Sequence, residues 1–290
     1  MNYKKNNIHQ VFNIVKVSFA QSFNLITFMK LTLTQKTALV CGSTQGIGKA
    51  VALELAHMGA NIVLLARNQD KLQQTLEELP TTAGQKHQFV VADFNQPIEL
   101  KAAVSKLIQG GTNIHILINN TGGPKGGAIK DADPSEFIMA FNQHLICNHI
   151  LAQLVYPGMI ADNYGRIINI ISTSVKQPLP NLGVSNTIRG AVASWSKTLA
   201  NELGAFGITV NNVLPGATNT QRLQTLAQIK ADQSGDTVED VLIEMGKETP
   251  MKRIALPEEI AAAVAFLASP AASYINGINV PVDGGRTKCL

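Results

Sequence analysis

The chain has 290 residues, of which 45% are apolar and 15% charged, and its net charge is +4. This length and composition are ordinary for a soluble globular domain with a substantial core. The mild charge, without any block of Lys and Arg, argues against a nucleic-acid partner, and no apolar run is long enough to cross a membrane.

Residues 1–28 differ from the rest of the chain because they contain no acidic residue and are rich in Phe and Asn. A targeting or membrane-surface segment is one interpretation, but its basic start is short, its apolar stretch is interrupted by Asn, Lys and Gln, and it has no Arg. We favour the other interpretation, a non-native or disordered extension from an upstream start codon, with the working protein beginning at Met29.

From residue 36 onward, short apolar runs alternate with stretches of helical spacing. The runs predict strands at 37–42, 61–66, 87–93, 114–120, 165–172, 207–214 and 278–282. The helical patterns include 48–59, about 69–79, about 134–162 and 183–204. Strands that are apolar throughout indicate a sheet buried on both faces. The alternation therefore predicts one α/β domain over 29–290, a doubly wound parallel sheet with helices on both faces.

The segment 217–256 is the most irregular part of the chain and is rich in Thr, Gln and Gly. Segments of this length in a compact domain often cover a binding site. We therefore expect residues 217–256 to form a lid over the substrate.

A glycine-rich run, Gly42-Ser-Thr-Gln-Gly46-Ile-Gly48, follows the first predicted strand and opens directly into a helix. Glycines allow a tight turn and let the backbone approach a pyrophosphate, and the helix N-terminus offers free N–H groups to that anion. A plain turn is the alternative, but the position between a strand and a helix favours a dinucleotide site.

This run resembles the cofactor fingerprint of the short-chain dehydrogenase/reductase family. The resemblance continues through Asp93, Asn119-Asn120-Thr121-Gly122, Pro215-Gly216 and Val282-Asp283-Gly284-Gly285, and it covers about residues 31–286. Overall it is similar to 3-oxoacyl-[acyl-carrier-protein] reductases, although nothing in the sequence specifies an acyl-carrier partner.

The resemblance implies that Asp93 bonds the adenine amino group, that Asn119 and Gly122 line the adenosine side, and that Pro215 to Thr218 face the nicotinamide. A solvated strand end for Asp93 and a capped turn for the two asparagines are the alternatives. The implied cofactor-binding set is Gly42, Ser43, Thr44, Gln45, Gly46, Ile47, Gly48, Arg67, Asn68, Asp93, Phe94, Asn119, Asn120, Gly122, Arg189, Pro215, Gly216, Ala217 and Thr218.

The end of the second predicted strand, Leu64-Leu65-Ala66-Arg67-Asn68, has no acidic residue. An acid there would bind the ribose 2′-OH and repel a 2′-phosphate, whereas the fork of donors on Arg67 suits a phosphate. We therefore predict NADP(H) over NAD(H). An Arg67 side chain in solvent would leave the preference open.

The resemblance also implies a catalytic Asn, Ser, Tyr and Lys, with the last two spaced Y-x-x-x-K. Ser172 fits the Ser, but Ser185 and Arg189 stand at the Tyr and Lys positions, and His144 falls at the Asn position. A Ser hydroxyl is a far weaker and shorter acid than a phenol, and Arg does not readily yield a proton. His144 is a candidate acid or base because imidazole titrates near neutral pH.

Each of these four residues also has a structural alternative. His144 could satisfy a backbone carbonyl, Arg189 could pair with a carboxylate, and Ser172 and Ser185 could cap local turns. The tyrosines outside this position, Tyr3, Tyr156, Tyr164 and Tyr274, do not fall where the catalytic Tyr is expected.

Three functions remain open on the sequence. The first is an NADP(H)-dependent oxidoreductase acting on a carbonyl or alcohol through an atypical site. The second is a non-catalytic NADP(H) sensor or scaffold, and the third is a lyase, isomerase or hydrolase on the same fold. The intact cofactor motifs favour the first, because the nicotinamide already carries the hydride chemistry.

The three cysteines, Cys41, Cys147 and Cys289, lie far apart without a C-x-x-C pair, which argues against a disulfide framework or a metal site and favours the cytoplasm. The resemblance implies a homotetramer or homodimer, packed through helices at about 134–162 and 183–204 and through the last strand. Leu151, Leu154 and Leu199 are candidate interface residues, with the intramolecular core as the alternative.

Overall fold

The structure is a computed structural model that describes residues 29–289. The chain divides into two units, residues 1–31 and residues 32–290, and every element named below belongs to the second. The predicted extension over 1–28 lies outside the described residues.

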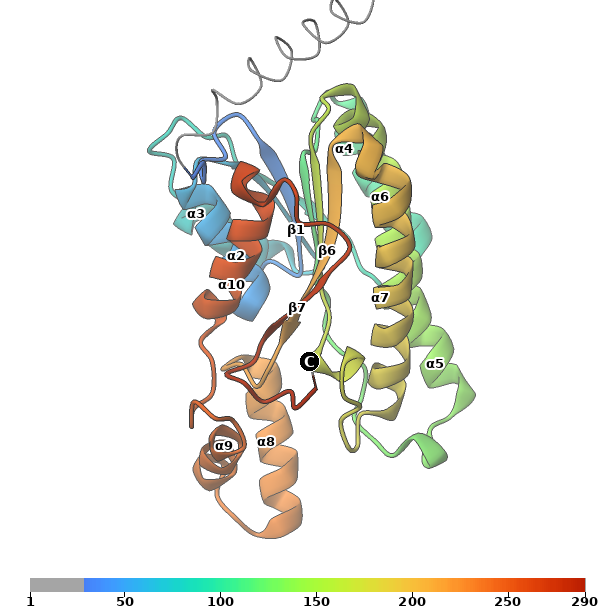
Figure 1. Cartoon of the computed structure of the whole chain (residues 1–290), viewed down its shortest axis with the longest axis vertical. Coiled ribbons are helices and arrows are strands. Elements are labelled where there is room, and N and C mark those ends of the chain that lie inside the picture. The colour runs from blue at the N-terminus through green and yellow to red at the C-terminus, as the bar shows by residue number, and fades with distance from the viewer. Residues whose placement is uncertain (1–28, 290) are drawn as a thin grey trace, which may run out of the picture. The chain divides into compact units, whose positions relative to one another are not determined.

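Seven parallel strands form one sheet in the order β3-β2-β1-β4-β5-β6-β7 (Figure 1). The strands are β1 (Thr37–Cys41), β2 (Asn61–Ala66), β3 (Gln88–Val91), β4 (Ile116–Asn119), β5 (Gly165–Ile170), β6 (Ile208–Pro215) and β7 (Asn279–Val282). Every predicted strand is present, and the predicted doubly wound fold is confirmed. The strand order reverses between β1 and β4, and ligands of such sheets bind beyond the carboxyl ends of the strands at this point.

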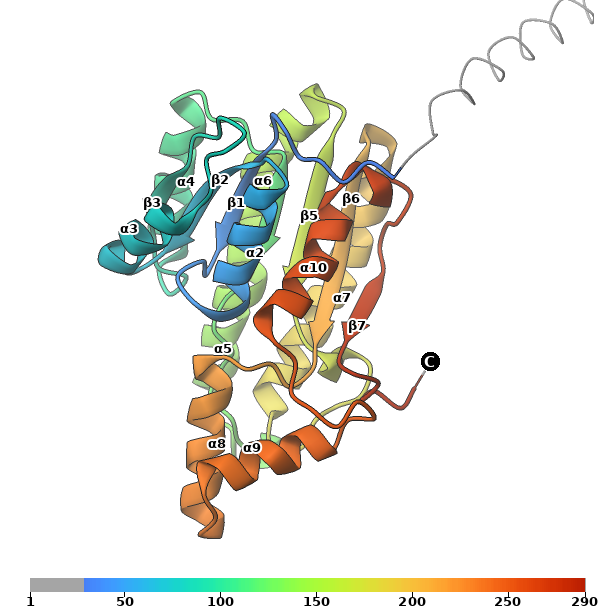
Figure 2. The ribbon, with the colours of Figure 1, turned by 90° about the vertical axis from the view of Figure 1, so that its left-hand side faces the viewer.

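Two helical layers bury the two faces of the sheet (Figure 2). One layer holds α2 (Gly46–His57), α3 (Gln69–Glu78) and α10 (Pro257–Ala268), and the other holds α4 (Pro97–Gln109), α6 (Cys147–Ala161) and α7 (Gly183–Leu203). Alternate residues of each strand belong to opposite cores: Val40 packs with the first layer and Leu39 with the second. This two-sided burial explains why the strand sequences are apolar throughout.

The predicted helix at 134–162 is interrupted. It consists of α5 (Pro134–Phe141) and α6, joined by a π-helical turn at Asn142–Ile146. A π turn inserts one extra residue into a helix and is frequent at functional sites. Here it includes His144, whose side chain is buried at 1% exposure.

The expectation of an irregular segment at 217–256 is wrong. The segment forms two helices, α8 (Gln221–Ser234) and α9 (Val238–Lys247), which lie beyond the carboxyl ends of the strands (Figure 2). Thr220 and Thr237 cap their N-termini, and Gly235 ends α8 with a φ of +80°. Their own small core is built around Ala227, Ala231 and Val241. The alanines of α8 give only a faint hydrophobic period, so the pattern did not reveal that helix. The apolar face of α9, formed by Val238, Val241, Leu242 and Met245, was a usable signal that sequence reasoning missed.

The leucines considered as interface residues belong to the core. Leu151 is fully buried, Leu199 is 9% exposed, and Leu154 packs partly buried against the same cluster beneath α6 and α7. Leu151 and Leu199 thus pack within the subunit, as the alternative predicted, whereas Leu154 is partly exposed. No helix between residues 29 and 289 is both long and apolar enough to cross a membrane.

Candidate functional site

The glycine loop after β1 is closely packed at its glycine positions. Gly42 and Gly46 have φ values of +59° and +53°, the left-handed region that favours glycine. A Cβ on Gly48 would lie 2.1 Å from the Gly42 carbonyl oxygen and 2.7 Å from the Asn120 Nδ2. The sequence therefore needs glycine here to bring the backbone close to its surroundings.

Asn120 holds this loop in place. Its Nδ2 donates to the carbonyl oxygens of Cys41 at 3.2 Å and Gly42 at 3.4 Å. These bonds tie the segment after β4 to the loop after β1, across the point where the strand order reverses. Asn120 thus fixes the backbone of the glycine loop at the predicted cofactor site.

The N-terminus of α2 offers its backbone N–H groups to a ligand. Gln45 is the N-cap residue, and its side chain makes no capping hydrogen bond. The first N–H groups of a helix have no partner within the helix, and the helix dipole places partial positive charge there. Backbone N–H groups without a capping partner, next to glycines that let a ligand approach, suit the binding of a pyrophosphate.

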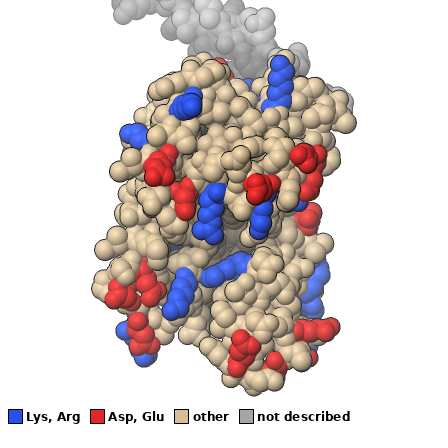
Figure 3. Space-filling view, turned by 180° about the vertical axis from the view of Figure 1, so that it is seen from behind, with Lys and Arg blue, Asp and Glu red and all other residues tan. Residues whose placement is uncertain are grey.

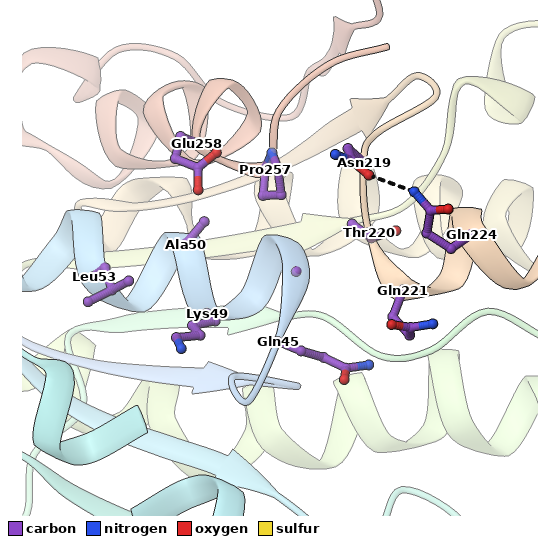
Figure 4. Close-up of a pocket in the computed structure, with 11 residues that line it drawn as sticks. Gln45, Lys49, Ala50, Leu53, Asn219, Thr220, Gln221, Gln224, Pro257 and Glu258 are labelled. Carbon is purple, nitrogen blue, oxygen red and sulfur yellow. Dashed lines mark hydrogen bonds between the residues drawn. The ribbon is translucent and has the colours of Figure 1, made fainter. Parts of the chain in front are cut away.

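A pocket of about 450 Å³ adjoins this loop between α2, α8 and α10 (Figure 4). It is lined by Gln45, Gly46, Lys49, Ala50, Leu53, Asn219, Thr220, Gln221, Gln224, Pro257 and Glu258. A Cβ on Gly46 would lie 3.1 Å from Thr220 Cγ2, and Gln224 donates to Asn219 at 3.1 Å. The glycine loop therefore touches the first turn of the predicted lid.

Arg67 lies exposed after β2 and forms no ion pair with any described residue. Its neighbour Asn68 caps α3 by accepting from the Lys71 N–H at 2.9 Å. Ser43 is buried, and its Oγ accepts from the Leu65 N–H at 3.1 Å. The side chains of Asn68 and Ser43 are thus engaged within the protein, whereas that of Arg67 remains available.

Asp93 and Phe94 follow β3. One carboxylate oxygen of Asp93 accepts from both the backbone N–H and the side-chain amide of Asn95, each at 2.9 Å. Phe94 packs partly buried against the core beneath α4 and α6, and its carbonyl accepts from the Cys147 thiol at 3.4 Å. Asp93 keeps its second oxygen for a ligand, while Phe94 serves chiefly as a core residue.

Asn119 belongs to a ladder of buried amides that crosses four strands. Asn119, Asn169, Asn212 and Asn279 are paired in register on β4, β5, β6 and β7. Each Nδ2 donates to the Oδ1 of the next, at 2.8, 3.0 and 2.8 Å. The Asn119 side chain is only 2% exposed and donates into the ladder, and its place beside the adenosine stays a prediction.

We expect Asn169→Ala to lower the free energy of unfolding by about 2–3 kcal/mol, because it leaves the buried Nδ2 of Asn119 without a partner and removes the hydrogen bonds that Asn169 donates to Ser196 and Asn212. Urea denaturation measures the change. Asn201→Ala, on the exposed face of α7, is the matched control and should shift stability by less than about 0.5 kcal/mol. Equal effects of the two changes would contradict a stabilising ladder.

The segment after β6 is fixed on both sides. The Gly216 N–H donates to the Val282 carbonyl at 3.0 Å, and a Cβ on Gly216 would lie 2.8 Å from the Asp283 Cα. Thr218 is buried and donates to the Gly216 carbonyl at 3.1 Å, while the Ala217 carbonyl accepts from the Ala255 N–H at 2.9 Å. This pairing presents Pro215 to Thr218 at the carboxyl end of the sheet.

The surroundings of His144 favour the neutral form of its ring. Burial, and secondarily the charge of Arg189, lower its pKa to about 2. Its Nδ1 forms a hydrogen bond of 2.6 Å with the Thr121 hydroxyl, and its Nε2 is buried without a partner among the described residues. The ring is therefore a neutral polar group, which was not predictable from its reference pKa.

Arg189 is buried at 7% exposure. Its Nη1 donates to the Ile170 carbonyl at 3.1 Å, and burial lowers its pKa to about 10, so it remains cationic at neutral pH. Within residues 29–289 no carboxylate pairs with it, so the alternative of a structural ion pair is wrong.

The two serines differ in their roles. The Ser172 Oγ accepts from the Ser174 N–H at 3.1 Å and caps the short helix Thr173–Val175, as its structural alternative predicted. Ser185 does not cap α7, since Leu182 is the N-cap residue. Ser185 and Arg189 are four residues apart in α7 and share one face. The carboxyl end of β5 and the start of α7 thus bring Ser172, Ser185 and Arg189 to one region.

Sequence reasoning missed three contacts of this site. Thr121 holds His144, Thr220 contacts the glycine loop, and the Arg222 Nη2 donates to the Pro124 carbonyl at 2.7 Å, which joins α8 to the segment after β4. Thr220 carried a usable signal, since Thr is a frequent N-cap residue. The other two depend on tertiary packing.

Comparisons with known proteins match nearly all of the described chain. A family model described as enoyl-(acyl carrier protein) reductase matches residues 42–287. Oxidoreductase UcpA of Escherichia coli strain K12 is 34% identical, over 88% of this chain and 95% of that protein. NADPH-dependent reductase BacG of Bacillus subtilis strain 168 is 29% identical, over 89% and 100%. The solved structure of L-sorbose reductase from Gluconobacter frateurii, complexed with NADPH and L-sorbose, is 32% identical with a TM-score of 0.85, over 90% and 100%.

Proposed function

Because the chain belongs to the short-chain dehydrogenase/reductase family, we propose that it transfers hydride between NADP(H) and a carbonyl or alcohol group of a small substrate. In this proposal, Ser185 and Arg189 stand in place of the usual Tyr and Lys. The observation that carries it is the glycine loop, whose uncapped helix N-terminus lies beside the carboxyl ends of β1 and β4.

NADP(H) is the cofactor that fits this site. Arg67 stands at the end of β2 with its guanidinium unpaired among the described residues, and no acidic residue occupies that strand end. Figure 3 shows Lys and Arg side chains around a hollow, with Asp and Glu side chains beside those on its upper rim, and the basic groups nearest the hollow suit a ligand with several phosphates. BacG and L-sorbose reductase, which are named with NADPH, support the same choice.

The atypical site is supported by where the tyrosines lie. The Tyr164 hydroxyl donates to the Ala268 carbonyl at 2.8 Å, and Tyr274 is fully exposed at 102%. Tyr156 packs against the core beneath α6, and Tyr3 lies outside the described residues. None of the three described tyrosines replaces the phenol that is absent at Ser185.

The chain's own groups then stabilise charge rather than supply a titrating acid. When bound, NADPH supplies the hydride that reaches the carbonyl carbon. The guanidinium of Arg189 and the hydroxyl of Ser172 stabilise the negative charge that develops on the carbonyl oxygen. Because His144 is neutral at physiological pH, the proton that completes the alcohol comes from water.

We expect Ser172→Ala to lower kcat/KM by roughly 100-fold, because one donor to the developing oxyanion is lost. NADPH affinity, followed by its fluorescence, should change less than about threefold, since Ser172 does not contact the cofactor in this proposal. Ser194→Ala, on an exposed position of α7, is the control. Equal kcat/KM for the two variants would remove Ser172 from the reaction.

A panel of ketones, diketones and 3-oxoacyl thioesters tests the function itself. Oxidation of NADPH with any of them supports the reductase. Tight binding of NADPH without any turnover would favour a sensor or scaffold instead, and turnover without net oxidation would indicate a lyase, isomerase or hydrolase.

The proposal also includes a lid at 217–256, a cytoplasmic location and a homodimer or homotetramer. The contact between Arg222 and the Pro124 carbonyl supports the lid, since it joins α8 to the rim of the site. Self-association is supported by apolar side chains on the surface, with Ile138 of α5 at 65% exposure and Tyr274 at 102%.

A further inference from the structure

Two arginines are buried among the described residues, and they differ in how their charge is compensated. Arg166, at the start of β5, donates to the carbonyls of Gly165 at 2.8 Å and Gly207 at 3.3 Å. Its guanidinium carbon also lies 4.3 Å from the centre of the Tyr164 ring, a favourable cation–π distance. Arg166 is thus stabilised from several sides by the protein itself.

Arg189 lies on α7 beside the opposite end of β5, and its positive charge has far less compensation. Its one hydrogen bond to a described residue goes to the Ile170 carbonyl, and none of those residues offers it a carboxylate or an aromatic face. Its neighbour His144 is neutral and has a buried Nε2 without a partner. Burying a cation without an anion is costly, so a missing negative partner is expected.

The surroundings of Arg189 leave room for such a partner. Its Nη2 faces the segment after β4 and lies 4.0 Å from where a Cβ on Gly123 would stand. A Cβ on Gly122 would meet no atom within 4 Å. One turn earlier in α7, Ser185 contributes only a short hydroxymethyl group where the family resemblance implies a Tyr side chain. Thr121, Ser172 and Ser185 add hydroxyl donors but no negative charge.

We infer that the substrate of this site is a small oxo acid whose carboxylate binds Arg189. This inference rests on the proposed function and adds the class of substrate to it. A guanidinium matches a carboxylate through two parallel hydrogen bonds, which a Lys ammonium cannot form. It has five N–H donors, and the Ile170 carbonyl uses one of them, so Arg189 can hold a carboxylate and still face a nearby carbonyl oxygen.

The test compares acids with their neutral esters in the NADP⁺-loaded protein, where the oxo compounds cannot be reduced. Calorimetry measures the dissociation constants of 2-, 3- and 4-oxopentanoate and of their methyl esters. At least one acid should bind at least about tenfold more tightly than its ester, since only the acid offers Arg189 a carboxylate for charge-assisted hydrogen bonds. Esters that bind as well as all three acids would overturn the inference.

Arg189→Met should abolish the preference for the acid, and Arg189→Lys should retain part of it. Arg166→Met is the matched control, since it removes a buried arginine from the far end of β5 and should leave the preference unchanged. Persistence of the preference in Arg189→Met would also overturn the inference. Because an uncompensated charge is removed, Arg189→Met should melt no lower than the parent protein. If it fails to fold, the decision rests on Arg189→Lys, in which an unchanged preference counts against the inference.

The two proposals fail in different ways. Reduction of the esters but not the acids would leave the reductase standing and remove the oxo acid. Without any cofactor, the acids should still raise Tm more than the esters, because a ligand of the folded state stabilises it. A protein that binds the acids in this assay but never binds NADPH would retain the carboxylate site and lose the proposed function.

Discussion

Arg67→Asp is expected to weaken NADPH binding by roughly 100- to 1000-fold while NADH binding changes little or improves. The substitution removes a planar donor group and places a carboxylate where the 2′-phosphate would lie. Hydrogen bonds to charged groups contribute about 1.5–3 kcal/mol each, and a bidentate pair contains two of them. Titration of the two cofactors, followed by nicotinamide fluorescence, gives both dissociation constants.

Two companion variants separate contact from net charge. Arg67→Ala removes the donors without adding repulsion and should weaken NADPH binding by about 100-fold, the lower end of the range expected for Arg67→Asp. Lys101→Asp makes the same change of charge at an exposed position of α4 and should leave the affinities for NADPH and NADH unchanged. If Arg67→Asp lowered the affinity for NADPH and NADH equally, Arg67 would not read the 2′-phosphate.

Gly48→Ala is expected to reduce NADPH affinity by more than about 100-fold and to lower Tm. The new Cβ would lie 2.1 Å from the Gly42 carbonyl oxygen and 2.7 Å from the Asn120 Nδ2. The Gly42 backbone cannot move without distorting the loop, and the Asn120 amide is held by its hydrogen bonds to Cys41 and Gly42. The loop must therefore shift away from the helix N-terminus that would hold the pyrophosphate. Fluorescence titration and thermal denaturation measure the two effects.

Gly190→Ala is the matched control for this change. Gly190 lies within α7, and a Cβ there would meet nothing within 4 Å. Alanine is more favourable than glycine inside a helix by about 1 kcal/mol, so this variant should melt slightly higher and bind NADPH as before. A Gly48→Ala protein with unchanged affinity would show that the cofactor does not depend on the close packing of this loop.

The sheet was predictable because its strands are buried on both faces. In β2, every residue from Ile62 to Leu65 is buried, so the apolar run marks the strand directly. Helix α8 was not predictable in the same way, since its buried face consists of Ala227 and Ala231, whereas the apolar face of α9 was present in the sequence and was overlooked. The π turn at Asn142–Ile146 was also not predictable, because a single extra residue does not visibly change the hydrophobic period of the sequence.

For the site, the sequence predicted which positions surround the cofactor better than it predicted the direction and charge of their side chains. The glycine loop and Arg67 were predicted where they lie, since their motifs depend on local backbone geometry. Ser43 and Asn119 turn into the protein, and His144 is neutral, because tertiary burial decides both direction and charge. Sequence spacing carries no information on either.

The amide ladder also constrains how the sheet can assemble. Successive side chains of a strand point to opposite faces, so a slip of one residue at β5 would turn Asn169 away from Asn119 and Asn212. Because Asn119, Asn169 and Asn212 all donate toward β7, neither Asn169 nor Asn212 can reverse its amide without losing the hydrogen bonds to both neighbours. A misaligned β5 would therefore bury amides without hydrogen-bond partners, which costs free energy. A core of aliphatic side chains alone would impose no such penalty on a shifted register.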